Sequence, residues 1–191
     1  MKFEKSKIEG SFIISQEPIS DNRGFFARAF CAHEFKNAGI ATKFVQSNVS
    51  YNHNAKTVRG LHFQHKPYEE DKLVSCLRGS IFDVIVDLRP KSSTYLQWFG
   101  VELTEKNGKS LYIPKGCAHG YQTLTDNTMI HYQVSQFYTP KSEDSLAWND
   151  PMLAIEWPYK EHVIISEKDS LNRSLLSKNL PNSIINKEFS L

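Results

Sequence analysis

Apolar and polar positions alternate along the middle of the chain. Between Lys43 and Tyr138, short alternating runs are separated by turn-forming residues such as Gly, Pro, Asn and Asp. Successive side chains of a β-strand point to opposite faces, so this alternation predicts strands that are apolar on one face. Short strands at close spacing are typical of a sandwich or barrel. Turns are expected at 52–54, 78–80, 90–93, 105–108 and 126–127.

The run Ile81–Leu88 is the clearest of the predicted strands. Its even-numbered residues, from Phe82 to Leu88, are all apolar and share one face, which we expect in the core. Asp83 and Asp87 share the other face. Two interpretations stay open for them: Asp83 points into a polar cavity or to solvent, and Asp87 is either buried or a surface carboxylate at the strand end.

Other segments lack this alternation. Residues 32–38 predict a short helix that ends at Gly39, where a left-handed C-terminal cap would fall. After Pro140, residues 148–158 predict a loop packed by two tryptophans, and the last twenty or so residues predict a weak helix or a frayed end. With no repeat or linker, we expect a single domain over 1–191.

Composition narrows the classes of function. The 191 residues include 40% hydrophobic and 12% aromatic side chains, enough for one sizeable core. Because 23 basic and 21 acidic residues nearly balance, the charge favours neither a nucleic acid nor a membrane as partner. Three cysteines without metal-type spacing argue against a disulfide framework and favour a reducing cytoplasm. No stretch reaches the roughly 18 apolar residues of a membrane-spanning helix.

Two glycine-containing runs carry the candidate chemistry, Arg59–Gln64 and Ile113–Gly120. In a regular strand Arg59 and His62 face opposite ways, so both serve one pocket only if Gly60 marks a bulge or bend. Each also has an ordinary explanation, a surface salt bridge for the arginine and a satisfied core histidine for His62. The recurrence of glycine and histidine favours one pocket inside a β-barrel.

Two tyrosines extend this pocket hypothesis. Tyr132 and Tyr138 share parity on a strand predicted over 127–138, and so project from the same face. Six residues of straight strand separate them by about 20 Å, a span that suits a long ligand such as a nucleotide-sugar. The alternative is that both are core aromatics whose hydroxyls bond to the backbone.

A His, a Lys, a Tyr and an Asp suffice for proton abstraction next to a carbonyl. The histidine is the base, held in one tautomer by a carboxylate. A lysine stabilises the enolate oxygen, and a tyrosine returns a proton to the opposite face, which inverts the carbon. Lys72 and Asp169 are available for these roles, although nothing in the pattern itself selects Asp169.

Over almost its whole length the chain resembles the dTDP-4-dehydrorhamnose 3,5-epimerase family. The resemblance implies a mainly β fold, a double-stranded β-helix or cupin-like jelly roll with short peripheral helices. It also implies homodimers that exchange N-terminal strands. The matching stretches are Asp21–Phe26, Phe44–Asn48, Arg59–Gln64, Lys72–Val74, Phe82–Arg89, Ile113–Gly120, Trp148–Pro151 and Ser166–Asp169.

The same resemblance implies roles for individual residues and a dTDP-4-keto-6-deoxyhexose as substrate. His62 would be the base, supported by Asp169, with Tyr132 as the acid and Lys72 near the keto oxygen. No cofactor and no metal are implied. The implied binding residues are Arg23 and Arg59 for phosphate, Gln46, Asn48, Glu143 and Lys168 for thymidine, Tyr138 stacked on the base, His119 in the sugar pocket, and Phe26 across a dimer interface.

The chain departs from the family pattern at two positions. Arg28 stands where the family usually has a carboxylate, so an acceptor becomes a donor among the implied substrate contacts. Cys117 replaces an aromatic residue at the pocket wall. Because members invert C3, C5 or both, the sequence does not decide which carbons change.

Two rival functions remain to be tested. The first is a metal-dependent cupin, since the run Pro114–His119 matches half of that metal signature. The other half needs a His-x-His pair, but Gln64 stands two residues after His62, so no metal site is predicted. The second is a non-catalytic sugar-binding barrel, against which His62, Asp169 and Tyr132 together argue.

Overall fold

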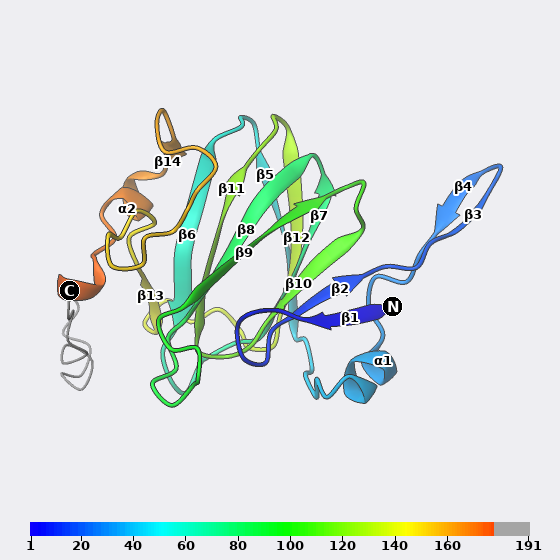
Figure 1. The fold of residues 1–191 in the computed structure, drawn as a ribbon, viewed down its shortest axis with the longest axis horizontal. Coiled ribbons are helices and arrows are strands. Elements are labelled where there is room, and N and C mark those ends of the chain that lie inside the picture. Colours follow the sequence, from blue (N-terminus) through cyan, green and yellow to red (C-terminus); the bar gives the residue numbers. More distant parts are fainter. Residues whose placement is uncertain (178–191) are drawn as a thin grey trace, which may run out of the picture.

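Two facing β-sheets form the body of the protein in a computed structural model, which describes residues 1–177 (Figure 1). The first sheet has the order β1-β2-β10-β7-β12-β5, and the second has the order β13-β6-β11-β8-β9 with β14 paired to β6. This arrangement confirms the predicted jelly roll. The strands are β1 (Lys2–Lys5), β2 (Phe12–Ser15), β5 (Gln46–Asn52), β6 (Thr57–Gln64), β7 (Lys72–Arg78), β8 (Ser80–Asp87), β9 (Trp98–Thr104), β10 (Lys109–Ile113), β11 (Cys117–Thr123), β12 (Thr128–Val134), β13 (Glu143–Ser145) and β14 (Ile164–Ile165).

Three apolar clusters hold these layers together. The cluster between the sheets joins Val74 and Ile130 of the first sheet to Ile81 and Ile85 of the second. A second cluster covers the outer face of β6 and β8 with the C-terminal segment, where Trp157 packs edge-on against Trp148. This confirms the predicted tryptophan-packed loop. The third packs α1 (Ala32–Asn37) against β2, β7 and β10. Both sheets are therefore covered over part of their outer faces.

The predicted alternation of β8 is present, but both of its faces are buried. Val84 and Val86 pack in the outer cluster, whereas Asp83 points between the sheets and is fully buried. The side chain of Asp83 therefore lies in the interior and not in solvent. The surface interpretation of Asp87 is wrong, because its carboxylate accepts hydrogen bonds from Arg89, Ser92 and Thr94 in the loop that folds over the strand end.

A hairpin of β3 (Ile19–Asp21) and β4 (Gly24–Phe26) projects away from the sheets as an arm (Figure 1). Three of its apolar side chains, Ile19, Phe25 and Phe26, are about 70% exposed. The arm runs into α1, which ends at Asn37 and is followed by Gly39 with a φ of +85°. The predicted short helix and its left-handed end are thus confirmed.

The C-terminal part of the described chain contributes two short elements, α2 (Glu167–Ser170) and a single 3₁₀ turn (Leu175–Ser177). The predicted weak helix or frayed end lies largely beyond residue 177, outside the described residues. Cys31, Cys76 and Cys117 are all free thiols. Within residues 1–177, no helix has the length and apolar character needed to cross a membrane.

Candidate active site

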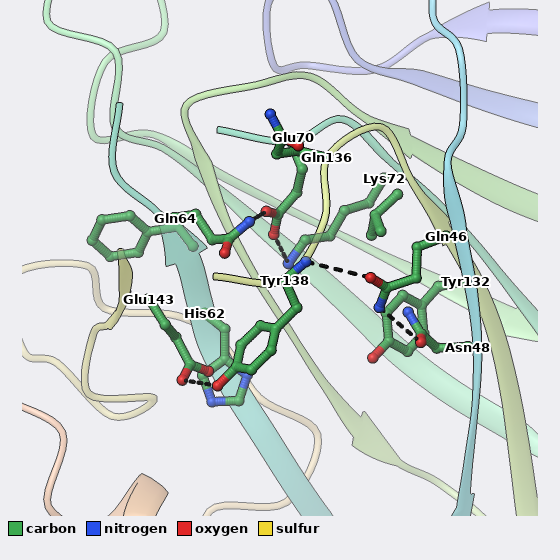
Figure 2. A pocket seen from close by; sticks show the side chains of 12 residues that line it. Gln46, Asn48, His62, Gln64, Glu70, Lys72, Tyr132, Gln136, Tyr138 and Glu143 are labelled. Atoms are coloured by element: carbon green, nitrogen blue, oxygen red, sulfur yellow. Dashed lines mark hydrogen bonds and ion pairs between the residues drawn. The ribbon is translucent and has the colours of Figure 1, made fainter. Parts of the chain in front are cut away.

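Both sheets contribute to a cavity between them (Figure 2). His62 and Tyr132 reach it from opposite walls, because β6 belongs to the second sheet and β12 to the first. Most of the side chains that line this cavity are polar, unlike those of the apolar core between the sheets, so the cavity is a candidate binding site. The cavity is lined by Gln46, Asn48, His62, Phe63, Gln64, Glu70, Lys72, Tyr132, Val134, Gln136, Tyr138 and Glu143.

A one-residue bulge in β6 sets the direction of the histidine. His62 pairs with His119 of β11, whereas Arg59 pairs with Tyr121, so the register shifts by one residue between them. Gly60 has a φ of +118°, and a Cβ there would lie 2.6 Å from the Cα of Gly120. Only glycine fits this position. The predicted bulge at Gly60 is confirmed.

His62 is bonded to a carboxylate that comes from far along the chain. Its Nε2 lies 2.7 Å from Oδ1 of Asp169 on α2, which is buried. The N–H of Gly60 donates to Oδ2 of the same carboxylate at 3.2 Å, and Ser166 Oγ caps the helix by accepting from the Asp169 N–H. The glycine bulge and the helix cap therefore hold the two partners of this pair together.

The charge of Asp169 decides which ring nitrogen of His62 is free to accept a proton. Burial would raise the pKa of Asp169, but the hydrogen bond from His62, its charge and the Gly60 N–H together hold that pKa below its ordinary value. The carboxylate is thus ionised at neutral pH. An anionic partner favours the proton on Nε2, which leaves the lone pair on Nδ1 as the proton acceptor.

On the opposite wall, Tyr132 is suited to be a proton donor. Burial raises the pKa of its phenol, with Arg59 opposing and Glu70 adding to the increase. Tyr132 therefore stays protonated through the neutral range. Arg59 acts from β6, where its Nε donates to Asn52 Oδ1 at 2.8 Å.

Lys72 brings a cation to the same cavity. Its Nζ lies 3.2 Å from Oε1 of Glu70, and both side chains are about 10% exposed. Gln64 donates to the other oxygen of Glu70 and accepts the N–H of Thr139 at 2.6 Å. Glu70 and Gln64 therefore fix the position of the Lys72 ammonium.

Tyr138 lies beyond the end of β12, so its predicted place on that strand is wrong. The strand stops at Val134, and the chain then turns, with the Tyr138 N–H donating to Gln46 Oε1 at 3.3 Å. The cavity nevertheless includes both tyrosines. The parity rule failed for Tyr138 because the strand ends before it. The prediction that Tyr132 and Tyr138 reach one cavity is confirmed.

Around Tyr138 the cavity wall is charged. The phenol donates to Glu143 Oε2 at 2.8 Å, and Lys168 Nζ lies 2.6 Å from the same oxygen. Gln46 donates to Asn48 Oδ1 at 3.1 Å, and both residues lie on β5. Five of the residues implied in thymidine binding thus lie together at one part of the site, within reach of the histidine on β6.

His119 lies directly across from His62 but forms a separate pair. Its Nε2 is 2.8 Å from Asp83 Oδ1, and both side chains are buried. His119 is not among the residues that line the cavity. Its implied place in the sugar pocket stays a prediction.

Six implied binding residues are absent from the cavity lining: Arg59, His119, Lys168 and three that lie on or just after the arm. Arg23 is paired with Asp21 on the arm, Phe26 is exposed on the arm, and Arg28 pairs with Glu34 of α1 at 2.7 Å. Their contacts with a ligand stay predictions.

The cavity also contains residues that the sequence reasoning missed as site residues. Gln64 shares the parity of His62 on β6, so the rule of alternation could have found it. Glu70 precedes β7, and its place is set by its contacts with Gln64 and Lys72. No group of three or more His, Cys, Asp and Glu side chains within residues 1–177 is arranged to hold a metal ion.

A jelly-roll cavity at which a His–Asp pair, a protonated tyrosine and a lysine meet is suited to acid–base catalysis. The family model for dTDP-4-dehydrorhamnose 3,5-epimerase matches residues 5–177. The chain belongs to the dTDP-4-dehydrorhamnose 3,5-epimerase family, which confirms the resemblance.

Individual relatives agree over most of their length. The dTDP-4-dehydrorhamnose 3,5-epimerase of Methanothermobacter thermautotrophicus is 41% identical over 171 residues, covering 88% of this chain and 91% of that protein. The enzyme of Bacillus anthracis, solved with TDP and pyrophosphate, is 38% identical with a TM-score of 0.88, covering 91% and 99% of the two chains. The Legionella pneumophila enzyme, solved with dTDP-4-keto-L-rhamnose, is 39% identical with a TM-score of 0.87, covering 92% and 93%. These findings support the epimerase and neither rival.

Proposed function

We propose that this chain inverts C3, C5 or both of a dTDP-4-keto-6-deoxyhexose, as a step towards dTDP-L-rhamnose. The single observation that carries the proposal is the pairing of His62 with Asp169 on one wall of the cavity, opposite Tyr132 on the other. A base and an acid on opposite faces of one carbon are what inversion requires.

In the first half of the reaction, His62 Nδ1 takes the proton from the carbon next to the 4-keto group. The C–H electron pair forms the enolate, and the keto oxygen becomes negative. Lys72 donates a hydrogen bond to that oxygen, where the charge develops. The ionised Asp169 stabilises the imidazolium that forms.

In the second half, Tyr132 gives its phenolic proton to the same carbon from the other face, and the keto group re-forms. Water returns a proton to the phenolate and removes one from His62, so the protons balance without a redox partner. The proposed reaction uses no cofactor and no metal.

The charged group around Tyr138 suits a nucleotide. We assign stacking on the thymine to Tyr138, and contacts with thymidine to Gln46, Asn48, Glu143 and Lys168. Arg59 and Arg23 would bind phosphate, and His119 would face the sugar. The ligand of the Legionella relative, dTDP-4-keto-L-rhamnose, supports this class of substrate.

The arm suits a homodimer. Three exposed apolar side chains on a projecting hairpin leave a surface that a second copy would bury. In this proposal the exchanged arm carries Phe26 to the nucleotide of the other copy, with Arg28 following it. We further propose that residues 1–191 are one domain and that the enzyme works in the cytoplasm.

The test is proton NMR of dTDP-4-keto-6-deoxyglucose with purified, chelator-treated protein in deuterated water. Loss of the C3 and C5 proton signals with the appearance of an inverted product is expected, and loss of one signal would make the enzyme a single-position epimerase. If neither carbon exchanges, and added divalent metal restores turnover, the metal-dependent rival is correct. If the nucleotide-sugar binds without exchange in either case, the chain is a binding barrel.

A further inference from the structure

One amide side chain behind the cavity links three elements of the site. Asn172 lies just past α2 and is not among the residues that line the cavity. Its Oδ1 accepts from Ser145 Oγ of β13 at 2.5 Å, and its Nδ2 donates to the carbonyl of Gly60 at 3.4 Å. Neither the alternation of residues nor the family resemblance gives Asn172 a role.

Both contacts of Asn172 are made with residues that position His62, the proposed base. Ser145 is the direct β-sheet partner of His62, and Gly60 is the bulge that turns His62 into the cavity. The N–H of Gly60 donates to Asp169 while its carbonyl accepts from Asn172. Thus the same peptide segment is held by the carboxylate on one side and by the amide on the other.

The short helix needs such support. With only four residues, α2 has too few internal hydrogen bonds to fix its own direction. The backbone N–H of Asn172 closes its end on the Asp169 carbonyl, and the Asn172 side chain also helps to lower the pKa of Asp169. Without Asn172, the helix would keep its Ser166 cap but lose its link to β13 and to the bulge.

We propose that Asn172 is a positioning residue that sets the angle between Asp169 and His62 by joining α2, β13 and the β6 bulge. The inference rests on the proposed function, because it deepens the account of the same base. A base that is displaced by a fraction of an ångström still binds substrate but takes the proton more slowly.

The test compares Asn172→Ala and Ser145→Ala with Glu167→Gln, an exposed substitution on the same helix. We expect Asn172→Ala to lower kcat by about 10-fold or more with little change in KM, as small misplacements of catalytic groups do. Ser145→Ala should lower kcat less, and Glu167→Gln should not change it.

A spectroscopic signal separates positioning from a general loss of structure. The Nε2–H proton of His62, bonded to Asp169, should give a low-field NMR signal that broadens or disappears in Asn172→Ala and persists in Glu167→Gln. An unchanged signal with an unchanged kcat in Asn172→Ala overturns the inference. If that variant does not fold, an unchanged signal and kcat in Ser145→Ala overturn it instead.

The wild-type protein distinguishes this failure from that of the proposed function. Wild-type exchange at C3 or C5 with no effect of Asn172→Ala contradicts only the positioning role. A wild-type protein without any exchange contradicts the epimerase itself, and the NMR signal of His62 then still reports whether Asn172 aligns the pair.

Discussion

Two histidine–aspartate pairs lie side by side, and they differ in access to the cavity although their His–Asp distances are nearly equal. The His62–Asp169 and His119–Asp83 distances are 2.7 and 2.8 Å, and the two histidines are direct partners across β6 and β11. The His62 side chain is 31% exposed and lines the cavity, whereas that of His119 is 10% exposed and does not.

The carboxylates differ as well. Asp169 comes from a short helix and accepts a second hydrogen bond from Gly60, while Asp83 is fixed in the middle of β8. Oδ2 of Asp83 is buried without a hydrogen-bond partner among the described residues. A hydrogen-bonded His–Asp pair is therefore not by itself a base. The pair that opens on the cavity, with a fully bonded carboxylate, is the one equipped to accept a proton.

The largest expected effect separates the two carboxylates. Asp169→Asn should lower kcat by about 10³-fold, within the range that general acid–base catalysis contributes, because the wrong tautomer of His62 is then favoured. Asp83→Asn should lower it by less than about 10-fold, since neither partner of that pair is placed to take or give the proton at the reacting carbon. Steady-state kinetics check this, and equal losses would show that both pairs act in the reaction.

Tyr132→Phe tests the proposed acid on the opposite wall of the cavity separately from the base. Formation of the inverted product should fall by about 10²-fold, while exchange of the substrate protons with solvent continues. Deprotonation by His62 does not need the phenol, but reprotonation from the other face does. Proton NMR in deuterated water follows both processes. If exchange stops in a folded variant, Tyr132 stabilises the enolate instead.

A third prediction concerns stability and reverses the order of the two histidines. His119→Ala should lower the free energy of unfolding by about 1–3 kcal/mol, because it leaves the buried Asp83 without its hydrogen-bond partner. His62→Ala should lower the free energy of unfolding by less, since Asp169 keeps its hydrogen bond from the Gly60 N–H. The His62 side chain also lies at an open cavity. Urea denaturation measures both. A larger loss for His62→Ala would contradict this assignment.

The smallest effect is the pH dependence of stability. The folded state holds the pKa of Asp169 below its ordinary value of 3.8, so the carboxylate stabilises the fold above that value. This contribution is lost as the pH falls through the folded pKa. The difference in unfolding free energy between wild type and Asp169→Asn should therefore shrink as the pH falls below 3.8 and through the folded pKa. A difference that stays constant would mean that Asp169 gains nothing from its partners.

Alternation along the chain left the direction of Asp83 open, but it was sufficient to predict the strands and the need for a bulge at Gly60. These depend on local geometry, in which each residue's direction follows from its neighbours. The resemblance to a family then suggested which polar residues belong together.

The long-range contacts could not be predicted from the pattern. Asp169 meets His62 across 107 residues, through a four-residue helix with no periodicity of its own. Tyr138 was misplaced because the turn after Val134 breaks the parity on which the prediction rested. Asp87 was left open because only the loop that follows it decides its burial. In each case the deciding contact is tertiary.

The most direct test of the account measures the initial rate of deuterium exchange at C3 and C5 in His62→Asn and in His119→Asn. If the cavity-facing pair removes the proton, His62→Asn abolishes exchange at both carbons, while His119→Asn keeps measurable exchange at the same positions. Normal exchange in a folded His62→Asn protein would contradict the claim that the cavity-facing pair removes the proton.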